Sequence, residues 1–307
     1  MLVAFLGNDR WSVPSLEAVA GSSHEVALVI TRVPRPAGRG GTLRPTPVAE
    51  AARRLALPLV EVETVKDGSG LEALRRAQPD VLALVAYGEV LPVQILELPR
   101  VAPVNVHFSL LPMLRGADPV RRAILQGFET TGVTTIRMDE GMDTGPILLQ
   151  VEERIADDED AGNLGDRLAV LGGRLLVETL DRLEAGAVVA GAQEHDRATM
   201  APKLRPEEEW IDWTEDAAAV RRRVRALAPD PGARTRFRGK ILKVLRVEEV
   251  DGSGDPGTVL DPVDERPVVA AGSRAVVLER VIPEGKKPMS GDDFARGYRP
   301  ELGERLG

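Results

Sequence analysis

The stretch Val81-Leu82-Ala83-Leu84-Val85 is a continuous apolar run, and Val104-Asn105-Val106-His107 is a second run in which apolar residues alternate with two polar ones. Short apolar runs of this kind are typical of strands that are buried on both faces of a parallel sheet. We therefore expect both stretches to lie near the centre of such a sheet, with helices covering its two faces.

The rest of the first half of the chain fits this arrangement. Short β-branched runs alternate with helical patterns, which favours an α/β domain with a mostly parallel sheet. The pattern predicts a helix at 13–20 between strands at 2–6 and 26–31. Thr46 followed by Pro47 predicts the start of another helix, because Thr is a good N-cap and Pro suits the first helical turn.

The second half of the chain begins after a long helical pattern at 163–183, where leucines recur three and four residues apart. We predict an α/β domain at 1–190, a polar linker at 191–208 and a smaller domain at 209–307. A short helix at 216–227 opens the smaller domain, and the strand-like runs after it are separated by Gly, Pro and Asp, which suits a small β-barrel. These runs are 241–247, 257–260, 268–271 and 275–278.

The composition is that of an ordinary globular protein, with 43% hydrophobic and 29% charged residues. No apolar run approaches the roughly 20 residues that a membrane span requires, and no basic leader precedes the first strand, so we expect a cytoplasmic protein. The absence of cysteine excludes disulfides and thiolate chemistry, and the three histidines are too far apart to indicate a metal site. We expect no metal.

Two segments are strongly basic although the net charge is −8. Residues 221–246 contain ten basic side chains against the single acid Asp230, which predicts a basic face. Residues 32–45, expected to form a long loop, contain four arginines, three glycines and no acid. This loop is either an ordinary solvated segment or one that binds phosphate, since Arg binds phosphate in bidentate fashion.

The polar residues of the second apolar run are the best candidates for chemistry. Side chains two apart on a strand share a face, so Asn105 and His107 project together from the carboxyl end of a buried strand, where open α/β sheets bind their ligands. A carboxamide can stabilise an oxyanion and an imidazole can move a proton, the pair of functions that acyl transfer needs. The alternative, a turn-forming Asn beside a satisfied buried His, leaves two polar groups at a costly position.

Asp143 lies in the turn-rich stretch 138–146, between strand-like runs at 133–136 and 147–151. Its carboxylate could orient the imidazole, although a turn residue is the alternative. Gly7 is not followed by the further glycines of a dinucleotide fingerprint, and no GxxxxGK[ST] motif occurs. Nicotinamide and ATP chemistry are therefore disfavoured.

Asn105-Val106-His107, Ser109-Leu110-Leu111-Pro112 and the downstream Asp143 resemble the signature of the folate-dependent formyltransferases. The resemblance to the branch of this family that acts on methionyl-tRNA extends along the whole chain. The further segments that carry it are 35–40, 85–88, 115–117, 131–134, 211–213 and 285–290.

The resemblance implies transfer of the formyl group of 10-formyltetrahydrofolate to the α-amino group of initiator methionyl-tRNA, a one-carbon transfer in translation initiation. It implies that Asn105, His107 and Asp143 are the catalytic residues, and that no metal takes part. The implied folate-binding residues are Ser109, Leu110, Leu111, Pro112, Tyr87 and Gly88. The implied tRNA-binding residues are Arg39, Arg35, Arg222, Arg236 and Lys240. A Rossmann-like catalytic domain and an OB-like tRNA-binding domain are the implied folds, and we expect a monomer that does not bind membranes.

Two other functions are compatible with the residues. A formyltransferase for an amino sugar or another small amine would share the catalytic trio but would not need the basic segment 221–246. A non-catalytic RNA-binding protein with a relict α/β domain would need the basic segment but not the trio. The chain also departs from the usual family pattern at Asn8-Asp9, Met113-Leu114, Asp230 and Arg234.

Overall fold

The computed structural model describes residues 1–37, 41–66 and 68–307. The chain divides into two compact units. The first unit comprises residues 1–119, 130–154 and 165–202, and the second comprises 120–129, 155–164 and 203–307.

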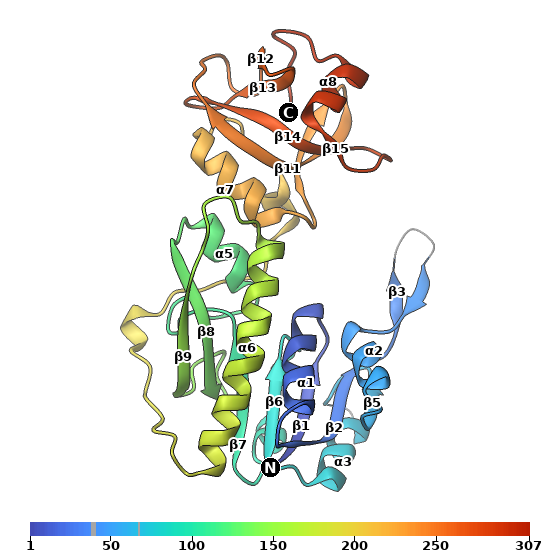
Figure 1. The fold of residues 1–307 in the computed structure, drawn as a ribbon, viewed down its shortest axis with the longest axis vertical. Coiled ribbons are helices and arrows are strands. Elements are labelled where there is room, and N and C mark those ends of the chain that lie inside the picture. Colours follow the sequence, from blue (N-terminus) through green and yellow to red (C-terminus); the bar gives the residue numbers. More distant parts are fainter. Residues whose placement is uncertain (38–40, 67) are drawn as a thin grey trace. The chain divides into compact units, whose positions relative to one another are not determined.

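The first unit is built on a seven-stranded sheet with the strand order β5-β2-β1-β6-β7-β8-β9 (Figure 1). Its strands are β1 (Leu2–Gly7), β2 (Glu25–Arg32), β5 (Leu59–Val62), β6 (Val81–Val85), β7 (Ala102–His107), β8 (Thr130–Arg137) and β9 (Ile147–Arg154). The pairings from β5 to β7 are parallel, and β8 and β9 are added antiparallel. The two apolar runs of the sequence are β6 and β7, and they are central as predicted.

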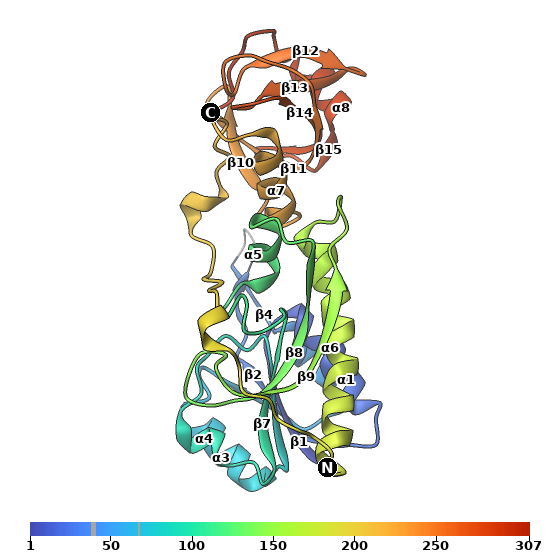
Figure 2. The same ribbon diagram turned by 90° about the vertical axis from the view of Figure 1, so that its left-hand side faces the viewer.

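Helices cover both faces of this sheet (Figure 2). One face packs against α1 (Val13–Ala20) and α6 (Ala161–Glu184), and the other against α3 (Gly68–Ala77) and α4 (Val93–Leu96). The core on the second side contains alternate residues of the strands with side chains from α3 and α4. On the first side α6 lies close to β7. The spacing is so tight at Gly172 of α6 that an added Cβ atom would be 3.0 Å from the Val106 side chain of β7.

The helix predicted at Thr46-Pro47 is α2 (Pro47–Arg54), and the Thr46 hydroxyl accepts a hydrogen bond from the Ala49 N–H at 3.0 Å. The long loop predicted at 32–45 is wrong in part. Residues Arg35–Ala37 (β3) and Thr42–Arg44 (β4) pair antiparallel, and residues 38–40 lie outside the described residues. Strands of three residues are too short to show a periodic pattern in the sequence.

The second unit contains an antiparallel sheet with the order β10-β11-β14-β13-β12, and β15 pairs with β14. Its strands are β10 (Ala233–Phe237), β11 (Lys240–Val250), β12 (Val259–Val263), β13 (Arg266–Ala270), β14 (Ala275–Pro283) and β15 (Met289–Ser290). Its helices include α7 (Ala217–Leu227) and α8 (Gly291–Tyr298), the latter not predicted from the sequence, and α5 (Pro119–Leu125) falls almost entirely within this unit. Short 3-10 turns occur at Arg10–Ser12 and His195–Arg197 in the first unit, and at Pro206–Glu209 in the second.

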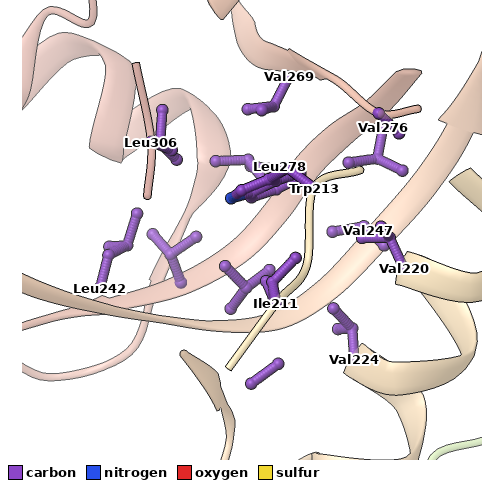
Figure 3. Packing of buried hydrophobic residues seen from close by; sticks show 14 of the residues in the cluster. Ile211, Trp213, Val220, Val224, Leu242, Val247, Val269, Val276, Leu278 and Leu306 are labelled. Atoms are coloured by element: carbon purple, nitrogen blue, oxygen red, sulfur yellow. The ribbon is translucent and has the colours of Figure 1, made fainter. Parts of the chain in front are cut away.

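The core of the second unit surrounds Trp213 (Figure 3). Val220 and Val224 reach it from α7, and Leu278 reaches it from β14. The indole N–H donates to the Thr235 hydroxyl at 3.0 Å, so the one polar atom of this buried ring is satisfied.

The predicted fold class is therefore confirmed: a Rossmann-like, mostly parallel sheet is followed by a smaller domain built on a separate antiparallel sheet. Closure of that second sheet into an OB-like barrel stays a prediction. Among the described residues, no helix has the length and apolar character needed to cross a bilayer.

Candidate active site

Asn105 and His107 lie at the carboxyl end of β7 and are almost fully buried, with 8% and 5% of their surface exposed. Val106 faces α6, so the strand's alternation turns both polar side chains to the opposite face. There they meet the loops after β7 and before β9, which contain Leu114 and Asp143. The sheet thus supplies a rigid base for two polar groups in an apolar setting.

The Asp143 carboxylate brings these groups together. Its Oδ1 atom accepts a hydrogen bond from Asn105 Nδ2 at 3.1 Å, and its Oδ2 atom lies 3.5 Å from His107 Nδ1. The backbone N–H of Gly116 also donates to Oδ2, at 2.9 Å. Asp143 has a φ of +53°, a left-handed conformation that Asp tolerates better than most residues.

The other side of the imidazole is fixed by backbone. Nε2 of His107 lies 2.9 Å from the carbonyl oxygen of Leu114. A carbonyl can only accept, so Nε2 carries a hydrogen and donates it. In the neutral ring this leaves the lone pair on Nδ1, the nitrogen that faces Asp143. A proton taken up at Nδ1 would then lie beside a carboxylate, which stabilises the resulting cation.

The turn after β7 contains the predicted folate-binding residues 109–112, and neighbouring polar groups hold it in place. The Thr134 hydroxyl donates to the Ser109 carbonyl at 2.6 Å and accepts from the Leu111 N–H at 3.2 Å. Gln150 donates to the Leu111 carbonyl at 3.0 Å. Ser109 and Leu111 are buried, whereas Leu110 and Pro112 are partly exposed.

Tyr87 and Gly88, the other predicted folate-binding residues, differ in accessibility. Only 1% of Tyr87 is exposed and its ring belongs to the hydrophobic core, so this residue can offer only its backbone to a ligand. Its carbonyl accepts a hydrogen bond from the Asn8 side chain. Gly88 is exposed, has a φ of +80°, and has no atom within 4 Å of the position that a Cβ would occupy.

Half of the ten basic side chains of segment 221–246 in the second unit form ion pairs with acids outside the segment. Arg223 pairs with Glu215, Arg234 with Glu209, and Arg238 with Glu304. Within the described part of the chain, no carboxylate lies within ion-pair distance of five residues of this segment. They are Arg222, Arg225, Arg236, Lys240 and Lys243.

Three of these five, Arg222, Arg236 and Lys240, are the predicted tRNA-binding residues of the segment, and Arg236 also lies 5.2 Å above the ring of Trp210. In the first unit, Arg35 is exposed and lies 4.0 Å from Glu63. Arg39 lies outside the described residues.

The sequence did not indicate Leu114, Gly116, Thr134 or Gln150 as site residues. Leu114 and Gly116 act through backbone atoms, which no side-chain pattern reveals. Thr134 and Gln150 lie on adjoining antiparallel strands and are paired in register, so only the strand pairing brings them together. No group of three or more His, Cys, Asp or Glu side chains that could hold a metal ion occurs among the residues that the structure describes.

Comparison with known proteins gives the family. The model of the formyl transferase family matches residues 1–180, and that of the formyl transferase C-terminal domain matches residues 203–299. This chain belongs to the formyltransferase family. The methionyl-tRNA formyltransferase of Solibacter usitatus is 43% identical to this formyltransferase over 310 residues, covering all of this chain and 99% of that protein. The enzyme of the same name from Koribacter versatilis is 41% identical, again covering 100% and 99%.

A solved structure supports the fold. HypX from Aquifex aeolicus, crystallised with tetrahydrofolic acid, superposes on this formyltransferase with a TM-score of 0.66 at 18% sequence identity. The match covers 98% of this chain but only 48% of HypX, so this chain spans about half the length of HypX.

Proposed function

We propose that this formyltransferase moves the formyl group of 10-formyltetrahydrofolate to the α-amino group of initiator methionyl-tRNA. Two curated relatives that match the chain over its full length are named methionyl-tRNA formyltransferase. The observation that supports this chemistry is the position of the Asp143 carboxylate. It lies beside both the carboxamide of Asn105 and the imidazole of His107, at the carboxyl end of a central strand.

In the proposed reaction, the neutral amine nitrogen of the acceptor attacks the formyl carbon, and the bond from that carbon to N10 of the folate breaks. Nδ1 of His107 takes the proton that the amine loses and returns it to N10, so no other reactant is needed. Asn105 has two amide hydrogens, and only one is needed for Asp143. The second donates to the oxyanion that forms on the formyl oxygen.

The folate co-substrate is proposed to bind beside the turn 109–112. Leu110 and Pro112 are its partly exposed apolar residues and can pack against a pterin ring. Ser109 and Leu111 support the turn from within. Gly88 offers backbone groups without the obstruction of a side chain.

Contacts to the tRNA are proposed for Arg222, Arg236 and Lys240, because these side chains lack carboxylate partners among the described residues and remain available to phosphates. Arg35 and Arg39 are proposed to contact the tRNA from the first unit. The cytoplasmic location, the monomeric state and the domain limits at 190 and 209 stay predictions.

The test is an assay of formyl transfer from 10-formyltetrahydrofolate to charged initiator tRNA, run beside an amino-sugar acceptor. We expect transfer to the tRNA, with an acceptor KM that rises steeply with salt because phosphate contacts release counterions. Transfer to the sugar alone, with a KM insensitive to salt, would identify a small-amine formyltransferase. Binding of RNA without binding of folate would identify a non-catalytic protein.

A further inference from the structure

Gln193 lies in the segment predicted to be a linker, yet only 6% of it is exposed. Its Nε2 atom donates to two backbone carbonyls, that of Asp143 at 2.9 Å and that of Gly145 at 2.7 Å. Its Oε1 atom accepts from Nε and Nη2 of Arg115, at 3.1 and 2.7 Å. One amide group therefore joins the backbone on both sides of Thr144 to an arginine that follows β7.

Arg115 is also buried, with 6% exposed. Its side chain bonds to Gln193 and approaches His195 Nδ1 at 3.0 Å, and in the described structure no carboxylate lies within ion-pair distance of it. A buried guanidinium without a counter-ion is costly. Its backbone is fixed as well, because Arg115 N donates to the Thr199 carbonyl at 2.9 Å and Arg115 O accepts from Ala201 N at 2.7 Å.

The position of Arg115 in the chain connects it to the site. Its two neighbours are Leu114, whose carbonyl accepts from His107, and Gly116, whose N–H donates to Asp143. The segment that fixes the imidazole and the carboxylate is therefore centred on Arg115. Gln193 joins this segment to the loop that contains Asp143.

We propose that Gln193 and Arg115 form a brace that positions Asp143 for the transfer reaction. The inference rests on the proposed function, and neither residue touches the reacting atoms. Asp143 adopts a left-handed φ of +53°, and such conformations persist only where the surroundings hold them. Without the two bonds from Gln193, the loop relaxes and the carboxylate moves from Asn105 and His107. A misplacement of about 1 Å can cost on the order of 10²-fold in rate.

The test compares Gln193→Met, which is similar in length and lacks all four hydrogen bonds, with the wild-type enzyme. We expect kcat to fall about 10- to 100-fold, while KM for the folate and for the tRNA changes less than about twofold. Circular dichroism and the melting temperature show whether the variant is folded. A loss confined to kcat in a folded variant indicates that the reacting groups are misplaced, whereas a general loosening of the fold would also weaken binding of both substrates.

Two further variants sharpen the test. Gln193→Glu keeps an acceptor for Arg115 but loses both N–H donors, so it should lose activity like Gln193→Met if the bonds to the Asp143 loop matter. Glu194→Gln is the matched control, because Glu194 is the next residue and pairs only with the exposed Arg197 in the described structure, at 3.0 Å. It should retain wild-type kcat.

A wild-type kcat in folded Gln193→Met would overturn the proposal that Gln193 and Arg115 position Asp143. Should that variant fail to fold, Gln193→Asn, one methylene shorter, provides the same readouts with the same two outcomes. An inactive wild-type enzyme would instead contradict the proposed function, so the two failures are distinguishable.

Discussion

Asp143 Oδ2 lies 3.5 Å from His107 Nδ1, and the opposite ring nitrogen of His107 lies 2.9 Å from the carbonyl oxygen of Leu114. The neutral imidazole is therefore held on one side, where Nε2 donates to the carbonyl, and the lone pair of Nδ1 faces the carboxylate on the other. The carbonyl sets the tautomer, and the carboxylate can stabilise the cation that forms when the ring takes a proton.

Replacing the carboxylate by an amide tests this relationship. Asp143→Asn keeps the shape of the side chain but removes the charge beside the imidazole, so we expect kcat to fall by at least about 10²-fold. Steady-state kinetics with purified enzyme measures the loss. Glu140→Gln removes an exposed carboxylate from the same loop and should leave kcat unchanged; equal activity of the two variants would contradict the role of Asp143.

Gly116 is a position where a side chain does not fit. Its φ is +120°, and an added Cβ would lie 2.8 Å from the carbonyl oxygen of Ala201. We expect Gly116→Ala to lower the free energy of unfolding by about 1–3 kcal/mol and to reduce kcat, because the Gly116 N–H holds Asp143. Urea unfolding checks the first effect. Gly297→Ala in α8, where the space is open, should change stability little or raise it.

Glu208 gives the stability of the second unit a pH dependence. Arg122 donates to both of its carboxylate oxygens, at 2.6 and 3.1 Å, and lowers the pKa of Glu208 from 4.5 to about 2. A lowered pKa stabilises the fold above the unfolded value of 4.5, and the contribution is lost as the pH falls toward 2. We expect Glu208→Gln to cost about 1–2 kcal/mol at pH 7.

Unfolding curves at a series of pH values test this prediction. The difference between wild type and Glu208→Gln should shrink steadily below about pH 4.5 and approach zero near pH 2. A difference that is the same at pH 3 and pH 7 would mean that the ionised carboxylate is not its source.

The basic residues without carboxylate partners should contribute to the binding of tRNA and not to the binding of folate. We expect Arg236→Ala or Lys240→Ala to raise the KM for tRNA and to reduce the slope of log KM against log salt by about one. Arg274→Ala is the control, because Arg274 pairs with Glu249 at 3.0 Å. Equal effects of all three variants would indicate a diffuse electrostatic contribution and not specific phosphate contacts.

Much of the fold could be predicted because local signals agree with it. The apolar run 81–85, the N-cap of Thr46 and the leucine spacing at 163–183 each depend on neighbours in sequence, and each corresponds to an observed element. The hairpin β3–β4 and helix α8 were not predicted. The former is too short for a pattern, and the latter has only eight residues, two of them glycines.

The candidate site also has a part that could be predicted from the sequence and a part that could not. Strand alternation predicted that Asn105 and His107 project together, which needs only local geometry. The bonds of Gln193 to Asp143 and Arg115 span 50 and 78 residues, and the contributions of Leu114 and Gly116 come from backbone atoms. Such contacts depend on how distant loops fold against one another, and a single sequence carries no signal for them. For the same reason the acids that pair with the basic segment could not be foreseen.

The most direct test of the whole proposal is the single-turnover rate of formyl transfer to charged initiator tRNA by Asn105→Ala, measured together with the affinity for a folate analogue. The loss of one oxyanion donor should reduce the rate by about 10²–10³-fold, while folate affinity and the melting temperature stay close to those of the wild type. A variant that transfers the formyl group at a near-wild-type rate would contradict the assignment of this site.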